Sequence, residues 1–497
     1  MGGWVRGIRA RPEVVNRAAW HDPVAGGKVA SKANLAFPKF NCVCYFTFVL
    51  TKRSFLSTSS AGALAALLCG SVRGDEWRAP LLDRGVSASA SYVGEAFGNV
   101  RGGRKRGATY EGLLTVNLDL DLEKLFGWKG ATVHATGYNP HGAGPTQKFV
   151  GDRSVVSNID FYDSARLFTL WMDQEFLNSR VSLRAGILAV DDEFAGSDYA
   201  AVLINSAFGV PSAQAAGFPL PIFAIAAPGV RLKVQPREGF YVQVAAYDGN
   251  PAPVLLPDPS PDAAPSSENN DHGTEWSLRP DEGAFLIGEI GVQFNRPLET
   301  TAAHDSQAPA PPRGLMGSYK VGFAWHTDTF SDSYGATLIE LGSSLAPAQA
   351  RGVRGNSVLY FIADQELWRE SGSEVQGLGA FLRGTLSPPG RNALSHSIDA
   401  GFHYTGLWPG RDDDVIAVGF SWLQASPEVS RAVRAANRAD RSRVAAPDHE
   451  AILELTYRIE VRPGWSVQPD VQWIIHPGGS REWGNALVLG LRTTVEF

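Results

Sequence analysis

The sequence has no long apolar run. Apolar residues make up 44% of its 497 residues, and the mean hydropathy is -0.11. No segment reaches the roughly 20 consecutive apolar residues that a transmembrane helix needs, so a helical membrane protein is disfavoured. A membrane β-strand needs an apolar side chain only at every second position. The same hydropathy is therefore compatible with a transmembrane barrel.

Cysteine is scarce and confined to the start of the chain. The three cysteines are Cys42, Cys44 and Cys69. The spacing of Cys42 and Cys44 fits neither a zinc knuckle nor a CxxC redox site. Cys69 follows two leucines, whereas a lipoprotein signal places a small residue there. We therefore expect no disulfide in the mature chain.

Motifs for catalysis and cofactor binding are also missing. There is no GxSxG elbow, no HExxH and no Walker-type phosphate loop, and the ten histidines show no ligand spacing. The sequence predicts no enzyme, no cofactor and no metal site. Residues 102–107, rich in glycine and arginine, lack a following helix pattern and are interpreted as a polar external loop rather than a phosphate cradle.

The first 74 residues differ from the rest. In 51–74, Lys52 and Arg53 precede a short apolar core, and small or neutral residues lead up to Asp75, which predicts a secretory signal cleaved before Asp75. A short core helix is the alternative. Residues 1–50 fit no targeting pattern and are expected to be an unstructured extension, with a start site assigned too early as one explanation.

Removing residues 1–74 leaves 35 basic and 49 acidic residues, a net charge of -14. Nucleic-acid binders are usually basic, so no nucleic-acid partner is expected. The acidic balance also argues, more weakly, against a dedicated anion channel. Residues 75–497 are predicted to form one β-barrel domain.

What the sequence does contain is two-residue alternation. At the C-terminus, Leu487, Leu489 and Leu491 fall on one face of a predicted strand, whereas Arg492, Thr494 and Glu496 fall on the other. An amphipathic helix would not produce this spacing. A soluble sandwich with one wet face is the alternative, but the number of such strands and the mixed charges on the polar face favour a pore.

The pattern predicts an all-β, transmembrane, antiparallel barrel. An even strand number and strands of about ten residues are typical of bacterial outer-membrane barrels. Sixteen strands are expected near 87–98, 112–123, 131–138, 166–176, 181–189, 228–235, 240–248, 284–294, 317–327, 357–367, 377–386, 396–405, 414–424, 450–461, 465–474 and 486–497.

The connections alternate between short and long, as expected for periplasmic turns and external loops. The link 295–316 is longer than this rule predicts and is interpreted as a Pro- and Ala-rich disordered insertion. The loop 190–227 is too apolar to extend freely into water. We expect it to fold into the lumen and narrow it, with its acids opposite the lumen arginines.

Tryptophans near the predicted strand ends are expected to form aromatic girdles at the membrane interfaces. They are Trp128, Trp171, Trp325, Trp368, Trp408, Trp422, Trp465, Trp473 and Trp483. Trp171 alternates with Leu170 and Met172, so an inward position is its alternative.

Several sequence blocks stand out, in order, over about 77–497. They include YVGEAFGN at 92–99, LDLDLEKLFGW at 118–128, SLRAG at 182–186, DDEF at 191–194, GLWPG at 406–410, HPGG at 476–479 and ALVLGLRTT at 486–494. Together these blocks resemble the OprB family of carbohydrate-selective porins. The extended N-terminus, 295–316 and 425–445 depart from the family pattern.

The resemblance implies an outer-membrane porin of about sixteen strands. It would pass glucose and other mono- and oligosaccharides by facilitated diffusion, and outer-membrane lipids would surround it. The resemblance does not decide between a monomer and a homotrimer. A general porin, an outer-membrane lipase and a TonB-coupled transporter are the rivals. The resemblance, together with the side chains predicted to face inward, gives eight candidates for the pore constriction. They are Glu95, Arg166, Glu175, Arg184, Asp191, Asp192, Arg231 and Arg383.

Overall fold

The computed structural model describes residues 75–211, 217–251, 270, 272–274, 276, 278, 282–295, 314–373 and 375–497. The predicted N-terminal extension and signal peptide lie outside the described residues. So does most of the predicted Pro- and Ala-rich insertion.

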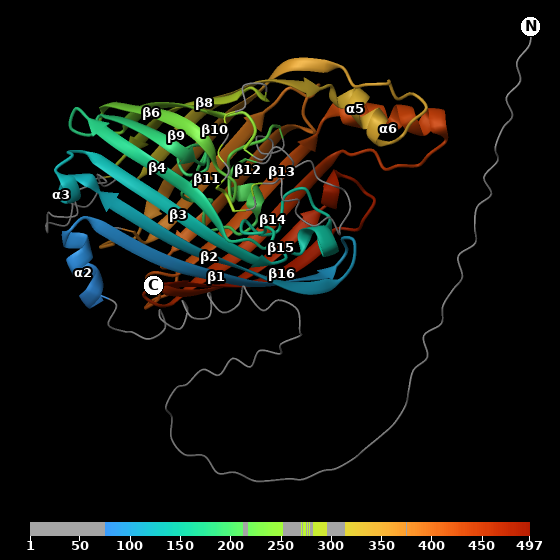
Figure 1. Cartoon of the computed structure of the whole chain (residues 1–497). Helices are drawn as coiled ribbons and strands as arrows, with labels where there is room; N and C mark the ends of the chain where they lie inside the picture. The colour runs from blue at the N-terminus through green and yellow to red at the C-terminus, as the bar shows by residue number, and fades with distance from the viewer. Residues whose placement is uncertain are drawn as a thin grey trace, which may run out of the picture. The chain divides into compact units, whose positions relative to one another are not determined.

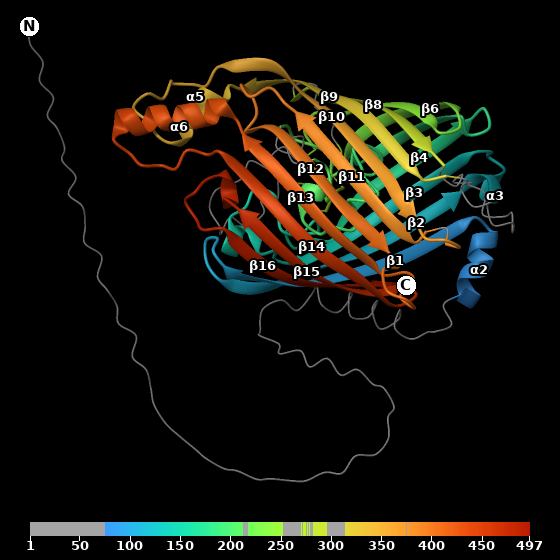
Figure 2. The same cartoon turned by 180° about the vertical axis from the view of Figure 1, so that it is seen from behind.

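The described strands close into one antiparallel barrel, in which each strand pairs with its neighbours in sequence and the first pairs with the last (Figures 1 and 2). This confirms the predicted fold class and strand number. The strands are β1 (Val86–Arg101), β2 (Gly107–Asp121), β3 (Ala131–Gly142), β4 (Arg166–Phe176), β5 (Val181–Leu188), β6 (Ala227–Arg237), β7 (Phe240–Asp248), β8 (Ala284–Phe294), β9 (Gly317–Ser331), β10 (Gly352–Arg369), β11 (Gly377–Leu386), β12 (Leu394–Thr405), β13 (Val415–Ala425), β14 (His449–Arg462), β15 (Trp465–Ile475) and β16 (Ala486–Glu496).

The seam between β1 and β16 closes the barrel. Its register runs from Ser91 opposite Glu496 to Arg101 opposite Leu487. Phe497 extends the pairing, since its backbone N–H donates to the Ala90 carbonyl at 2.8 Å. Closure leaves no strand edge unpaired, as a sheet in lipid requires.

Alternation along the strands gives the barrel an apolar outer face. Leu489 and Leu491 are 45% and 51% exposed, whereas Val488, on the inner face, is fully buried. The same alternation holds around the barrel. Exposed apolar residues of this outer band include Val116, Leu118, Leu232, Val244, Leu286, Ile290, Val321, Phe323, Leu359, Phe361, Leu382, Ile398, Phe402, Val418, Phe420, Leu453, Leu455 and Val471.

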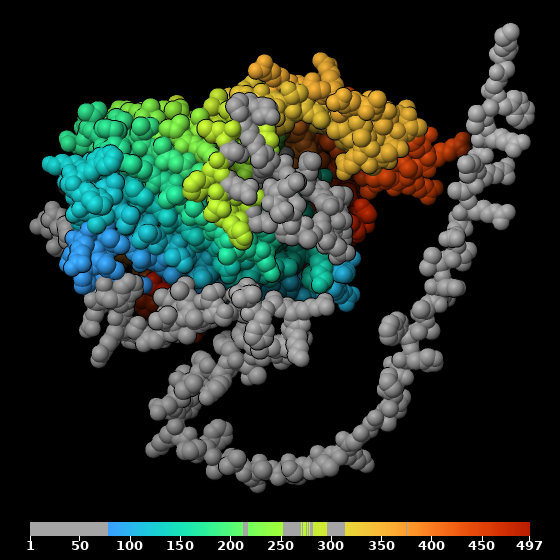
Figure 3. Space-filling view, viewed as in Figure 1, coloured from blue at the N-terminus to red at the C-terminus, as the bar shows by residue number. Residues whose placement is uncertain are grey.

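The two ends of the barrel differ. The turn end carries short connections such as 177–180, 238–239 and 463–464, together with α2 (Asp75–Asp83) and α3 (Leu122–Phe126). The loop end carries the long connections. It also carries α5 (Ser333–Glu340) and α6 (Pro427–Asp440), which project to the right in Figure 3, and η1 (Thr146–Val150), η2 (Ser206–Phe208) and η4 (Pro477–Gly479). Across the described residues, no helix is both long and apolar enough to cross a membrane.

Two local features differ from the prediction. The strand expected at 112–123 ends at Asp121, because the Asp121 carboxylate accepts from the backbone N–H groups of Glu123 and Lys124 and caps α3. Leu122, which falls inside the expected strand 112–123, is instead buried in this helix. The link expected at 425–449 contains α6, which Ser426 caps and Pro427 begins.

Two loops from the loop end pack against the inner wall: the loop 143–165, through Phe149, Val150 and Val156, and the loop 189–226. One apolar cluster joins Leu203, Ile204 and Phe208 of the loop 189–226 to wall residues such as Phe381 and Ile452. A second cluster joins the start and end of the same loop to inner-wall residues of β7–β10. The apolar residues in the described parts of this loop, 189–211 and 217–226, are therefore explained by their contacts with the inner wall.

Candidate functional site in the barrel interior

Polar side chains of the inner wall hold the loop 189–226 in place. Glu454 lies on the inner face of β14, and its carboxylate accepts from the backbone N–H groups of Ile204 at 2.5 Å and Asn205 at 3.0 Å. From β10, Asp364 accepts from the backbone N–H of Asp198 at 3.0 Å. Charge-assisted bonds to main-chain groups satisfy both partners and fix the path of the loop.

Arg383 of β11, one of the predicted constriction residues, makes the most extensive contact with this loop. It is fully buried. Its guanidinium donates to the carbonyl oxygens of Ala207 at 2.6 Å and Phe208 at 2.7 Å, and to the carboxylate of Asp399 at 2.9 Å. The side chain is thus directed at the loop backbone rather than at open space.

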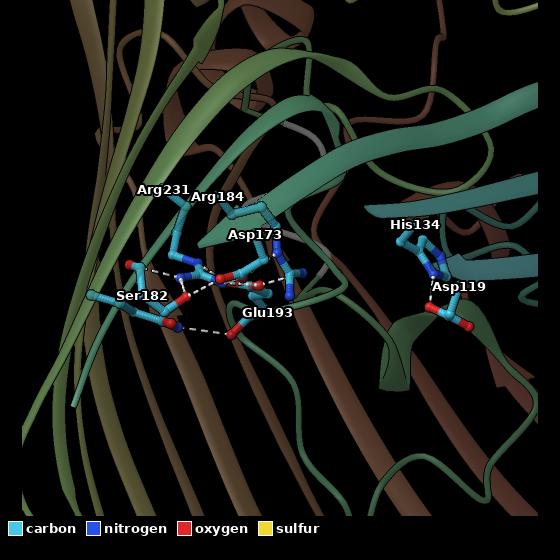
Figure 4. Close-up of polar contacts among 8 residues, drawn as sticks. Asp119, His134, Asp173, Ser182, Arg184, Glu193 and Arg231 are labelled. Carbon is cyan, nitrogen blue, oxygen red and sulfur yellow. Dashed lines mark hydrogen bonds and ion pairs between the residues drawn. The ribbon is translucent and has the colours of Figure 1, made fainter. Parts of the chain in front are cut away.

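Arg184 and Arg231, two further predicted residues, form one charged cluster with Asp173 and Glu193 (Figure 4). The Asp173 carboxylate accepts from Arg184 at 2.9 Å and from Arg231 at 2.8 Å. Glu193, from the loop, pairs with Arg184 at 2.5 Å and also with Arg231. Two cations and two anions balance, so the cluster has no net charge.

The two arginines differ in their free donors. Arg231 has only 4% of its side chain exposed, and its Nε and both terminal nitrogens donate to Asp173, Glu193 or Ser182. Arg184 is 18% exposed and contacts carboxylates through Nε and one terminal nitrogen. A guanidinium has five N–H donors, so Arg184 retains donors for a solute.

Trp171 sets the orientation of Arg184. The Arg184 guanidinium lies 3.5 Å from the centre of the Trp171 ring, and His134 stacks on the same ring at 4.6 Å. His134 in turn contacts the Asp119 carboxylate at 2.6 Å (Figure 4). Trp171 therefore faces inward, as the alternative interpretation proposed, and does not belong to a girdle.

Glu95 lies in a second cluster, on the β1–β16 seam. It is fully buried and pairs with Arg492 directly opposite. The Ser157 hydroxyl donates to Glu95, and Arg492 donates to the Asn158 side chain, both at 2.6 Å. This pair ties the loop 143–165 to the wall.

Asp191 and Asp192 begin the loop 189–226. Asp191 accepts from the Phe223 backbone N–H at 2.9 Å. Desolvation raises the pKa of Asp191 to about 6 and that of Asp192 to about 7, with the nearby Asp191 charge as a second cause for Asp192. Asp192 is exposed, yet the protein atoms around it desolvate its carboxylate.

The remaining two predicted residues lie apart from these clusters. Arg166, at the loop end of β4, donates to the Tyr162 hydroxyl at 2.9 Å and lies over the Phe161 ring. Glu175, at the turn end of the same strand, accepts from the Ser179 hydroxyl at 2.5 Å. The structure therefore does not bring all eight candidates to one place.

Sequence reasoning missed Asp173 and Glu193 as site residues. Asp173 lies two residues from both Trp171 and Glu175, so strand alternation would have placed it on the inner face. Glu193 follows Asp192 directly, within a motif whose acids were expected to face the lumen arginines. Within the described ranges, no group of three or more His, Cys, Asp or Glu side chains is suited to hold a metal ion.

Comparison with known proteins agrees with this architecture. The family model described as "Carbohydrate-selective porin, OprB family" matches residues 105–497. Porin B of Pseudomonas aeruginosa is 24% identical over 444 residues, covering 84% of this chain and 89% of its own length. A putative porin, QuiX, of Acinetobacter baylyi is 21% identical over 444 residues, covering 84% of this chain and 91% of its own.

Among solved structures, the high-pH structure of Pseudomonas putida OprB superimposes with a TM-score of 0.74 at 22% identity, covering 85% of this chain and 97% of that one. This likeness supports the barrel fold. The family match extends over most of the chain and includes all but one of the predicted site residues. The chain belongs to the OprB family of carbohydrate-selective porins and is a sugar-selective porin of the bacterial outer membrane.

Proposed function

We propose that neutral sugars, glucose and related mono- and oligosaccharides, diffuse through the barrel along the loop 189–226, which narrows the lumen. The observation that carries this proposal is the neutral cluster in which Arg184 retains donors beside two carboxylates. A sugar loses water on entering a narrow passage, and these groups replace the lost hydrogen bonds. Binding stays weak enough for release, and passage needs no covalent step or cofactor.

The eight predicted residues take different parts in this proposal. Arg184 contacts the sugar, whereas Arg231 and Asp173 hold its guanidinium in place. Arg383 and Glu95 anchor the two inward loops, and Asp191 and Asp192 set the charge at the loop's start. Arg166 and Glu175 border the passage at opposite ends. Contact of outer-membrane lipids with the apolar band and assembly into a homotrimer are further predictions.

Liposome swelling with solutes of similar size tests the proposal. Glucose should enter faster than mannitol, a polyol of similar size but without a ring, and faster than anionic gluconate. Arg184→Lys keeps the charge but lacks the planar fork, so it should reduce the preference for glucose over mannitol. Arg180→Lys, on an exposed turn, is the matched control.

The rival function, a general porin, predicts that the size of the solute alone determines the order of the uptake rates. Equal rates for glucose and mannitol in the parent protein would contradict the proposed selectivity. An unchanged preference in Arg184→Lys would contradict the role of Arg184.

A further inference from the structure

Seven exposed cations gather at one side of the loop end. They come from three separate segments: the end of β1 with the turn that follows it, the loop containing η1, and the loop between β15 and β16 (Figure 1). We call this set the basic rim. It consists of Arg101, Arg104, Lys105, Arg106, Lys148, Arg153 and Arg481.

Main-chain hydrogen bonds hold the three segments together. The Gly103 N–H donates to the Gly484 carbonyl at 2.8 Å, and the Lys105 N–H donates to the Phe149 carbonyl at 3.0 Å. The buried Asn99 side chain donates to the carbonyls of Gly102, Lys105 and Phe149. The basic rim is therefore a preformed surface, and a ligand would not have to order it.

Within the described residues the positive charge of the basic rim is balanced only in part: the buried Glu450 carboxylate accepts from the Arg153 backbone N–H and interacts with the Arg153 charge. Throughout the described part of the chain, none of its seven cations forms an ion pair with a carboxylate. The same three segments contain four acids: Asp163 and Glu482 are exposed, Asp160 is half-buried and Asp152 is buried, so the seven cations remain in excess. In a chain with a net charge of -6, this concentration of cations favours an anionic partner.

Two of the arginines are already oriented. One terminal nitrogen of Arg104 donates to the Gln147 carbonyl at 2.7 Å, and Nε of Arg153 donates to the Gly478 carbonyl at 3.0 Å. Each guanidinium keeps further N–H groups. Arginine forks bind phosphate oxygens in pairs, so phosphate is the anion that this geometry fits best.

Strand register places part of the basic rim on the outside of the barrel. Arg101 pairs with Leu487. Leu487 lies on the same face of β16 as the exposed Leu489 and Leu491 of the outer band. The exposed Arg106 immediately precedes β2, whose outer face carries the half-exposed Tyr110 four residues further on. Cations thus lie where the apolar band ends at the loop end, which is the external side in outer-membrane barrels.

We propose that the basic rim binds the phosphate groups of a glycolipid in the outer leaflet. A lipid whose acyl chains contact the apolar band would place its headgroup phosphates beside Arg101 and Arg106. Juxtamembrane cations attract anionic headgroups in this way. The proposal rests on the membrane location and is independent of the sugar that the lumen passes.

Native mass spectrometry in detergent tests the proposal, with purified bisphosphorylated lipid A as the probe. The variant Arg101→Gln/Lys105→Gln/Arg106→Gln should bind it at least about tenfold more weakly than the parent. The matched control is Arg431→Gln/Arg434→Gln/Arg438→Gln, which removes three exposed arginines from α6 and should leave binding unchanged. Arg101→Lys/Arg106→Lys should retain most of the binding.

Heat-modifiable migration on a gel and unchanged glucose uptake would show that each variant has a folded barrel. The proposal is overturned if the rim variant binds as the parent does, or if the α6 control loses as much affinity. It is also overturned if dephosphorylated lipid A binds equally well. Displacement of the lipid by low millimolar inorganic phosphate, but not by chloride at the same ionic strength, would assign the surface to a free anion instead.

Discussion

Glu193 joins the loop 189–226 to the barrel wall. Its carboxylate pairs with both Arg184 and Arg231, and Asp173 pairs with the same two arginines from the opposite side. The formal charges of these four side chains cancel, so the side chains present donors and acceptors without adding a net charge of their own. At the scale of single residues, this balance supports the proposal that the pore passes an uncharged solute.

Replacing Glu193 by Gln should disturb this balance. Two arginines would then share one carboxylate, leaving an excess positive charge in the lumen, and the anion-to-cation permeability ratio should rise by about threefold or more. Reversal potentials across planar bilayers under a salt gradient measure this ratio. Glu238→Gln removes the same charge from an exposed turn and is the control. An unchanged ratio in Glu193→Gln would contradict the assignment of the cluster to the pore.

The pore should also respond to pH through the acids of the loop. Because the pKa of Asp192 is raised to about 7 and that of Asp191 to about 6, both carboxylates are ionised at pH 8 and largely neutral at pH 5. Cation preference should therefore fall as the pH is lowered through this range. Asp191→Asn/Asp192→Asn should flatten the profile. A parent profile that is already flat would count against the position of these acids in the ion path.

At the scale of elements, the loop 189–226 and the strands depend on each other. The loop covers apolar inner-wall residues, and the wall supplies partners for loop main-chain groups that water does not reach. A buried main-chain group without a partner costs free energy, so the anchors hold the loop to one path. The anchors come from strands far apart in sequence and act together only because the barrel is closed.

Arg383 is the anchor whose loss should widen the pore. Arg383→Met removes the bonds to the loop carbonyls and leaves the buried Asp399 carboxylate unpaired, at a cost of about 3–5 kcal/mol of folding stability. Single-channel conductance and the entry of a trisaccharide into liposomes should both increase. Arg383→Met/Asp399→Asn should regain stability in urea titration while keeping the wider pore. Parent-like conductance in both variants would contradict the anchoring role.

At the scale of the whole molecule, alternation was enough to predict the barrel. All sixteen expected strands are present, and the segments 166–176, 240–248, 284–294 and 377–386 end where expected. Errors occur where a local signal overrides alternation, as at Asp121, whose cap turns the chain into α3. The helix α6 was missed because its signals lie in a segment that was interpreted only as a loop.

The site was less predictable than the fold. Alternation indicates that a side chain faces inward, but not its height along the barrel axis or which loop atom it meets. Arg184 and Arg383 have the same sequence context, a basic residue on a short strand, yet one retains free donors and the other is consumed by the loop. That difference depends on the path of the loop, which long-range contacts determine.

Single-channel current in the presence of glucose is the most direct test that the loop-lined interior is a sugar pathway. Glucose in the pore should displace ions, so the current should fall in a saturable way as glucose is added, and mannitol should reduce it less. In Arg184→Lys, a higher glucose concentration should be needed to reach half of the maximal reduction in current. A current that stays the same up to high glucose, or falls equally with any small polyol, would contradict the pathway described above.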